Sequence, residues 1–407
     1  MMQKSSAFCI QGGITMLISI SIVLLSGLLF GWLCKKVHLP SLFGMIIAGV
    51  IVGPGVLNLL DGSLLAISSD LRRIALIIIL IRAGLKLDIS DLKRVGRPAV
   101  LMCFVPACCE VFGMVLLAPK LLGLSTLDAA VLGAVIGAVS PAVVVPRMIR
   151  LIDEGYGVRE GIPQMILAGA SVDDVFVIVL FTTFTSLALG DHVSVMSFVN
   201  IPISILSGIF AGALCGVGLS FLFSKTKMNT PTKVIVMFVI SFVLNWMEGA
   251  QAAIPFAGLI AIMSVGTMLK KKKEQLAKEL SQAFDHLWVP AELFLFVLVG
   301  ASVAIDSAKD AGAMSVILIL LVLVFRMSGV CLCTLGTRLT KKERLFCMLA
   351  YTPKATVQAA IGGLPLAMGL TCGNTVLTVS VIAILITAPL GAFAIDSTYR
   401  KLLKKAV

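Results

Sequence analysis

The chain has 407 residues, a formal net charge of +12, 59% hydrophobic residues and only 13% charged residues. Soluble globular domains are about 45–50% apolar and about 25% charged, so this chain has too little polar surface for an ordinary soluble enzyme. The excess of Lys and Arg does not indicate nucleic-acid binding, because these residues occur as short groups between long apolar runs and not on one basic face.

The apolar runs are long enough to cross a bilayer as helices. A membrane-spanning helix needs about 20 mostly apolar residues, with a range of about 17–25. Thirteen such runs, bounded by charged residues, glycine or proline, predict an all-α polytopic membrane protein with 13 transmembrane helices. In chain order the runs are 14–33, 41–60, 71–87, 98–118, 126–148, 162–189, 196–224, 232–248, 252–269, 288–305, 312–336, 345–368 and 372–395.

The loops between the runs predict an orientation, because cytoplasmic loops of membrane proteins carry an excess of Lys and Arg. If the N-terminus is outside, most Lys and Arg of this chain fall in loops that are then cytoplasmic. We therefore expect an external N-terminus and a cytoplasmic C-terminus in the cell (inner) membrane. Lys270–Lys273 and the following EQLAKELSQAFDHL predict an amphipathic cytoplasmic helix that touches anionic lipid headgroups.

Two adjacent acids, Asp173 and Asp174, lie inside the sixth run. They project about 100° apart on a helix, so both can reach one polar cavity. Two close carboxylates do not readily ionise together, and we expect one to hold a proton near neutral pH. Once deprotonated, the pair offers oxygens to a small hard cation. A purely structural pair is the alternative, but ionisable residues inside membranes are usually functional. The pair therefore predicts an exchange of protons for a cation.

The fifth and twelfth runs are predicted to be broken helices. Pro141 and Pro146 each remove a backbone donor from the fifth run, which is expected to open near Ser140. Pro353 interrupts the twelfth run, and Lys354 follows at once, where its charge can neutralise the carbonyl end of a half-helix. The two runs are seven apart and so run in opposite directions. Two broken helices in corresponding positions of two halves are typical of an inverted-repeat transporter.

A second charged pair is predicted between Glu110 in the fourth run and Arg326 in the eleventh. These runs are also seven apart, and each comes one position before a broken helix. Because an unpaired buried charge is costly, we expect the two side chains to neutralise each other. Their role could be purely structural.

At these residues the sequence resembles the cation:proton antiporter superfamily, and within it the Asp-Asp branch that contains the NHA-type sodium/proton antiporters. The resemblance extends over nearly the whole membrane portion of the chain. The matching stretches are GMIIAGVIVGPGVLNLL (44–60), ALIIILIRAGLKLD (75–88), GAVSPAVVVP (137–146), AGASVDDVFVIVLF (168–181) and PKATVQAAIG (353–362).

The resemblance implies a homodimer in which a mobile core domain moves like an elevator against a dimerisation domain. Residues 98–189 and 312–396 would form the two halves of the core, with the two discontinuous helices crossing at the ion site. The other segments would be the N-terminal dimerisation helices, a linker helix with the remaining dimerisation helices, and a cytoplasmic tail, at 1–97, 190–311 and 397–407.

The resemblance also implies roles for the charged residues. Asp174 would be the principal carboxylate for cation and proton, with Asp173 as its partner. Lys354 would be the lysine at the crossing point, and Glu110 would pair with Arg326 in the core. Better-known Asp-Asp antiporters have a lysine at the place of Arg326, and an arginine does not release a proton in proteins.

These features predict a secondary-active antiporter that exchanges Na⁺ or Li⁺ for H⁺, without an enzymatic cofactor. Asp173, Asp174 and Ser140 are the expected ligands of the transported cation. A sodium-coupled symporter of an organic anion on a related inverted-repeat fold is the alternative, but it would need a roomier cavity with polar residues for a carboxylate. A channel would more often repeat a selectivity loop or a ring of charge, and no such repeat is evident in the sequence.

Overall fold

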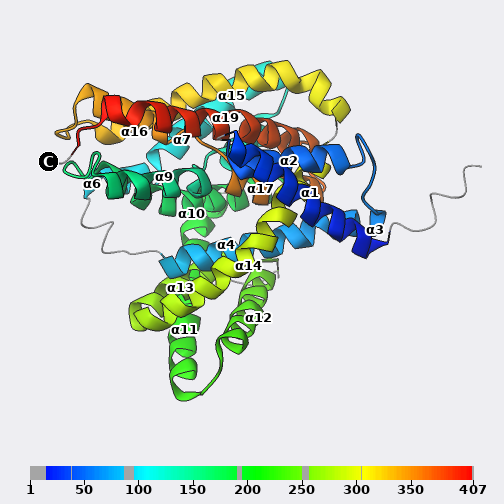
Figure 1. Cartoon of the computed structure of the whole chain (residues 1–407), viewed down its shortest axis with the longest axis vertical. Coiled ribbons are helices and arrows are strands. Elements are labelled where there is room, and N and C mark those ends of the chain that lie inside the picture. The colour runs from blue at the N-terminus through cyan, green and yellow to red at the C-terminus, as the bar shows by residue number, and fades with distance from the viewer. Residues whose placement is uncertain are drawn as a thin grey trace, which may run out of the picture.

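The computed structural model describes residues 15–37, 39–86, 96–189, 195–249, 256–303 and 305–405 (Figure 1). Apart from one isolated bridge between Tyr156 and Lys405, the regular structure of these residues is helical. The helices are α1 (Met16–Lys36), α2 (Ser41–Val52), α3 (Gly62–Ala66), α4 (Ser68–Lys86), α6 (Arg97–Met102), α7 (Val105–Leu122), α8 (Thr126–Ile136), α9 (Pro141–Glu154), α10 (Ile162–Ala188), α11 (Val195–Lys225), α12 (Thr230–Gly249), α13 (Gly258–Lys272), α14 (Glu274–Ala301), α15 (Ile305–Thr334), α16 (Lys341–Ala350), α17 (Thr356–Ile361), α18 (Leu364–Ala367) and α19 (Gly373–Leu402).

The prediction of an all-helical membrane protein is confirmed. Among the described residues, nine helical segments are long and apolar enough to cross a membrane, and two shorter apolar helices accompany them. The described part of every predicted apolar run lies largely in one helix or in a series of short helices, although α2 ends at Val52, eight residues before the end of the second run. Residues 14, 87, 252–255 and 304 of these runs lie outside the described residues. The count of thirteen crossings stays a prediction.

Two local features differ from the sequence prediction. The expected amphipathic cytoplasmic helix and the tenth run form one continuous helix, α14, of 28 residues. The chain breaks instead at Lys273, whose extended backbone separates α13 from α14. The fourth run is divided into α6 and α7 at Cys103 and Phe104. Pro106 lies in the first turn of α7, where the amide that proline lacks needs no intrahelical partner.

The helices pack in two groups (Figure 1). One group contains α1, α2, α4 and α11–α14, and the other contains α6–α10 and α15–α19. Backbones approach closely in the first group: a Cβ built on Gly49 of α2 would lie 2.0 Å from the Val297 carbonyl oxygen of α14. In the second group α7 packs between α8 and α15, and α10 packs against α8 and α9.

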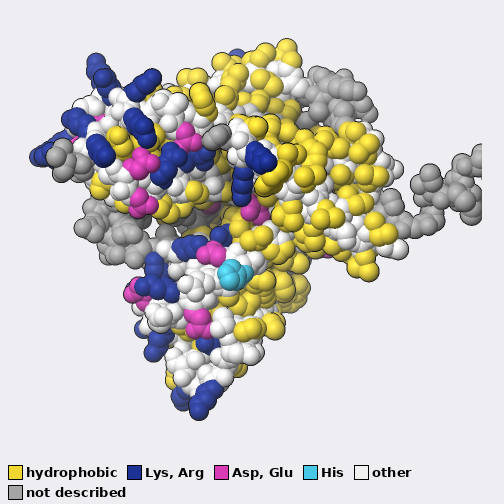
Figure 2. All heavy atoms as spheres, in the orientation of Figure 1, with side chains coloured by type: hydrophobic (Ala, Val, Ile, Leu, Met, Phe, Trp, Pro, Cys, Tyr) yellow, Lys and Arg dark blue, Asp and Glu magenta, His cyan; other side chains and the backbone are white. Residues whose placement is uncertain are grey.

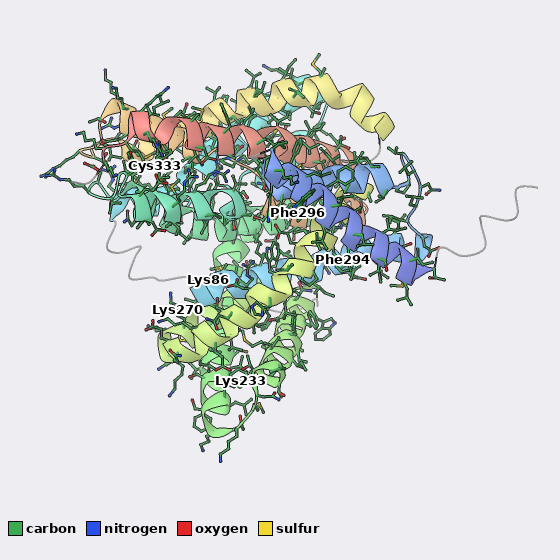
Figure 3. All side chains as sticks on the ribbon, viewed as in Figure 1. Lys86, Lys233, Lys270, Phe294, Phe296 and Cys333 are labelled. Carbon is green, nitrogen blue, oxygen red and sulfur yellow. The ribbon has the colours of Figure 1, made fainter. Side chains whose placement is uncertain are left out.

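The outer surface is apolar over most of its area, which fits a lipid environment. Exposed side chains on α11 and α12 include Phe210, Phe221 and Trp246. Figure 2 shows this apolar surface on the right of the view, with the visible Lys and Arg side chains mostly along the left side and at the lower tip. Lys86 of α4 and Lys270 of α13 lie on the left side, where the Lys270 Nζ donates to the Lys86 carbonyl at 2.8 Å (Figure 3).

Candidate functional site

The predicted break in the fifth run lies between α8 and α9. The α8 helix ends at Ile136, and α9 begins at Pro141, whose ring is tolerated at a first helical position. The intervening residues Gly137–Ser140 are non-helical and buried. Non-helical backbone at membrane depth must find hydrogen-bond partners inside the protein, so the partners of this segment identify what it faces.

The break in the twelfth run faces the first one. The α16 helix ends at Ala350 and α17 begins at Thr356, so Pro353 and Lys354 lie in the non-helical segment between them. The Ser140 amide donates to the Pro353 carbonyl oxygen at 2.8 Å. The Lys354 amide donates to the Thr387 hydroxyl of α19 at 2.9 Å. The two interrupted segments are therefore in direct backbone contact.

Three consecutive carbonyls at the end of α8 are engaged by side chains from the second half of the chain. The Gln358 Nε2 donates to the carbonyl oxygens of Ile136 at 3.1 Å and Ala138 at 2.9 Å. The Arg326 Nη1 donates to the carbonyl oxygen of Gly137. These contacts of Gln358 could not be predicted from local sequence, because a glutamine in an apolar run gives no sign of its partners.

Asp173 is held firmly beside the first break. Its side chain is fully buried. The Oδ2 atom accepts from the Val139 amide at 2.8 Å and from the Arg326 Nη2 at 2.9 Å. A carboxylate that accepts both an amide and a guanidinium donor is favoured in its charged form, so Asp173 has a fixed position and a fixed counter-ion.

Arg326 connects both predicted acidic groups. Besides its contact with Asp173, its Nη1 lies 2.7 Å from the Glu110 Oε2, and its Nε donates to the Tyr351 carbonyl at 2.6 Å. The sequence analysis paired Arg326 with Glu110, and in the structure the guanidinium contacts both Glu110 and Asp173. The fork of a guanidinium permits this, because its donors point in several directions.

Lys354 also belongs to this network. Its fully buried Nζ lies 2.5 Å from the same Glu110 Oε2 that contacts Arg326. The sequence placed Lys354 at the carbonyl end of a half-helix, and the structure adds Glu110 as its ionic partner. Two buried cations, Arg326 and Lys354, thus face two buried carboxylates, Glu110 and Asp173.

Tyr351, which the sequence analysis did not select, joins this network to a third helix break. Its hydroxyl donates at 3.0 Å to the carbonyl of Met102, the last residue of α6. Its ring also lies beside the guanidinium of Arg326, with 5.1 Å between the Arg326 Cζ and the ring centroid. A buried tyrosine usually finds a partner for its hydroxyl, but no pattern in the sequence shows where that partner is.

Asp174 differs in its surroundings from these four charged residues. Within the part of the chain that the structure describes, no basic side chain forms an ion pair with Asp174. Some buried oxygens of the region have no hydrogen-bond partner among the described residues. They are the Ser140 Oγ, the Asp173 Oδ1, the Asp174 Oδ1 and the Thr356 Oγ1. Buried polar atoms are rarely left without partners, and oxygens of this type suit a small hard cation.

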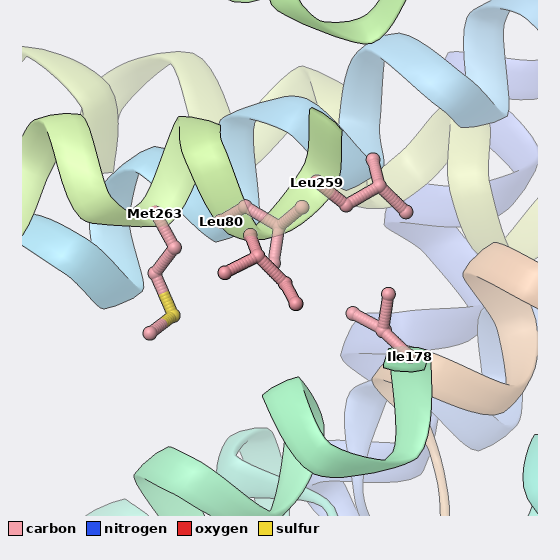
Figure 4. Close-up of a pocket in the computed structure, with 5 residues that line it drawn as sticks. Leu80, Ile178, Leu259 and Met263 are labelled. Atoms are coloured by element: carbon pink, nitrogen blue, oxygen red, sulfur yellow. The ribbon is translucent and has the colours of Figure 1, made fainter. Parts of the chain in front are cut away.

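One helical turn after the carboxylate pair, α10 faces an apolar region. A small apolar gap lies between α4, α10 and α13 and is lined by Leu80, Ile178, Leu259, Ile260 and Met263 (Figure 4). The residues that line it carry no charge. The polar site on α10 therefore lies next to an apolar contact between the two helix groups, formed by α10 with α4 and α13.

The comparisons with known proteins identify the family. Residues 20–400 match the family described as "Sodium/hydrogen exchanger, transmembrane". The chain belongs to the sodium/hydrogen exchanger family. It is 33% identical over 381 residues to sodium/hydrogen exchanger 9B2 of Homo sapiens, a match that covers 90% of this chain and 70% of that protein. It is 32% identical to sodium/hydrogen exchanger 9B2 of Xenopus tropicalis, with 98% and 76% covered.

A solved structure agrees with this membership in the sodium/hydrogen exchanger family. The chain superimposes with a TM-score of 0.82 on the sodium proton antiporter MjNhaP1 from Methanocaldococcus jannaschii, over 95% of this chain and 98% of the other. The sequence identity is 21%, so the likeness concerns the fold alone. Together these matches confirm the resemblance to the cation:proton antiporter superfamily and to its NHA-like sodium/proton exchangers.

Proposed function

We propose that this chain is a secondary-active antiporter that exchanges Na⁺ or Li⁺ for H⁺ across the cell (inner) membrane. Family membership supports exchange of sodium for protons. The observation that carries the proposal for this site is the charge balance around Asp174. Glu110 and Asp173 each contact a buried cation, whereas Asp174 forms no ion pair within the described residues.

The proposed exchange follows from this balance. Asp174 is half-buried, and its Oδ1 is a buried oxygen without a partner. A carboxylate in such a place without a counter-ion lowers its desolvation cost by binding either a proton or a cation. Asp174 therefore carries a proton in one half of the cycle and contributes to a Na⁺ or Li⁺ site in the other. The unpartnered oxygens of Ser140, Asp173 and Thr356 are the further candidate ligands. Asp173 is positioned by Arg326 and tunes the affinity.

The architecture of the proposed transporter has thirteen membrane crossings in an inverted repeat with two discontinuous crossing helices. The contact between the Ser140 amide and the Pro353 carbonyl supports the crossing. Residues 98–189 and 312–396 form the mobile core, and 1–97 with 190–311 form the dimerisation domain. The separate packing of two helix groups supports this division.

The proposed movement is an elevator-like shift of the core against the dimerisation domain in a homodimer. The apolar contact between α10 and the pair α4 and α13 supports such sliding, because apolar surfaces exchange partners without breaking ion pairs. The N-terminus lies outside, and the C-terminus, with the tail 397–407, lies in the cytoplasm. Lys270–Lys273 at the end of α13 then reach anionic lipids at the cytoplasmic face.

The test is transport by the purified chain in proteoliposomes with a trapped pH dye. Addition of Na⁺ or Li⁺ under an imposed proton gradient should change the dye signal, and Asp174→Asn should abolish that change. Asp61→Asn is the matched control, because Asp61 caps α3 by accepting from the Ser63 amide at 2.9 Å and asparagine caps equally well. A wild-type signal that does not depend on the cation would refute antiport. Exchange that survives Asp174→Asn would refute the assignment of the carboxylate.

A further inference from the structure

Five backbone polar groups at the first break are engaged in a specific pattern. The carbonyls of Ile136 and Ala138 accept from Gln358, and the carbonyl of Gly137 accepts from Arg326. The next two amides donate to the Asp173 carboxylate and to the Pro353 carbonyl. No backbone oxygen from Ile136 to Ala138 is left without a donor.

Gln358 contributes most to this pattern. Its side chain is 1% exposed, and its Nε2 bridges the two carbonyls of α8. Its Oε1 accepts from the Ala355 amide at 2.8 Å, at the start of its own helix α17. These contacts fix the orientation of the side-chain amide. Exchanging its oxygen and nitrogen would bring two acceptors together at the carbonyls of Ile136 and Ala138 and two donors together at the Ala355 amide.

Backbone carbonyls at the ends of interrupted membrane helices are cation ligands in many transporters. Such carbonyls do not titrate, so a cation held by them displaces no proton. Near the break, the buried side-chain oxygens without a hydrogen-bond partner include two that belong to carboxylates. These oxygens are the Ser140 Oγ, the Asp173 Oδ1, the Asp174 Oδ1 and the Thr356 Oγ1.

We propose that Gln358 is a positioning residue that enforces the coupling between cation and proton. By occupying the carbonyls of Ile136 and Ala138, it restricts the cation to oxygens that include the titratable carboxylates. The inference rests on the proposed antiport. Gln358 does not contact the transported ion. It acts by occupying the carbonyls of Ile136 and Ala138, which are then not available as ligands of the cation.

The test compares the pH dependence of the apparent Na⁺ affinity in the wild type and in Gln358→Met, which keeps the length of the side chain and removes both donors. If one proton is displaced per cation, the wild-type apparent affinity weakens about tenfold for each pH unit below the titration range. In Gln358→Met this slope should become markedly shallower, and K⁺ should become a better competitor of Na⁺. A merely structural role would lower the maximal rate and leave the slope and the ion preference unchanged.

Gln164→Met is the matched control, because Gln164 lies in the first turns of α10, remote in sequence from the carboxylate pair on that helix. Its slope should equal that of the wild type. If Gln358→Met does not fold, Gln358→Ala replaces it, since alanine removes the amide donors without adding a titratable group. Na⁺-dependent thermal stabilisation over a pH series measures the same slope without transport.

The outcomes separate the two proposals. A wild type that shows no cation-dependent proton movement refutes the antiport itself. A wild type that exchanges, together with a folded Gln358 variant of unchanged slope and unchanged ion preference, refutes only the role of Gln358.

Discussion

Because the buried charges of the core share contacts, they predict a pattern of variant stabilities that an isolated ion pair would not give. Glu110 contacts both Arg326 and Lys354, and Arg326 also contacts Asp173. Two double substitutions each remove one acidic and one basic group. Glu110→Gln with Lys354→Gln leaves Arg326 and Asp173 in contact at 2.9 Å. Glu110→Gln with Arg326→Gln leaves Lys354 and Asp173, which form no ion pair with each other among the described residues.

The magnitude follows from the burial of all four side chains, which are at most 1% exposed. Removing one partner of a buried pair costs about 3–5 kcal/mol, because the other charge is left uncompensated. An unfolding entropy of about 2.1 cal/mol/K per residue gives a shift of about 1 °C per kcal/mol for a chain of 407 residues. Each single substitution should therefore lower the unfolding midpoint by about 3–5 °C.

Thermal unfolding in detergent measures these midpoints. It is followed by the fluorescence of a dye that does not react with thiols, because the chain has free cysteines. The double change of Glu110 and Lys354 should recover most of the loss, and the double change of Glu110 and Arg326 should recover less. The reverse order would mean that Glu110 and Arg326 form an isolated pair, and it would refute the shared network. Strictly additive losses in both double variants would show that Glu110 is not coupled energetically to either cation.

Three further predictions concern the site and the packing. Asp173→Asn should weaken the apparent cation affinity more than it lowers the maximal rate, because Asp173 is fixed by Arg326; a complete loss of exchange in a folded variant would contradict this role. Cation binding should release protons, so the heat of binding should differ between buffers of different ionisation enthalpy, and the affinity should weaken as the pH falls. Calorimetry measures both, and heats that do not depend on the buffer would indicate separate sites for proton and cation. Gly49→Ala should destabilise the protein by about 1–3 kcal/mol, because the new Cβ would overlap the Val297 carbonyl. Gly62→Ala is its control in a thermal scan, since a Cβ there meets nothing within 4 Å, and equal midpoints of the two variants would contradict the close packing.

The positions of the two central breaks could be predicted from local sequence. Pro141 and Pro353 lack an amide donor and disturb the preceding turn, and this effect operates in any tertiary context. The third break, at Cys103 and Phe104, was missed although Pro106 follows it. Proline is compatible with a helix start as well as with a kink, so Pro106 alone does not distinguish a continuous helix from a divided one.

The membrane class of the protein and its charged candidate residues were determined by the sequence itself. Long apolar runs must be helical in lipid, and Asp173, Asp174, Glu110, Arg326 and Lys354 stand out because lipid disfavours charge. The partners of these residues were decided only by the tertiary structure. Arg326 contacts Glu110 across 216 positions of the chain, and Lys354 contacts Glu110 across 244. Contacts between such distant residues depend on how the two halves pack and on where each side chain points, and neither is encoded in a local pattern. The same reason explains why the role of the neutral Gln358 emerges only when the carbonyls of α8 are seen beside it.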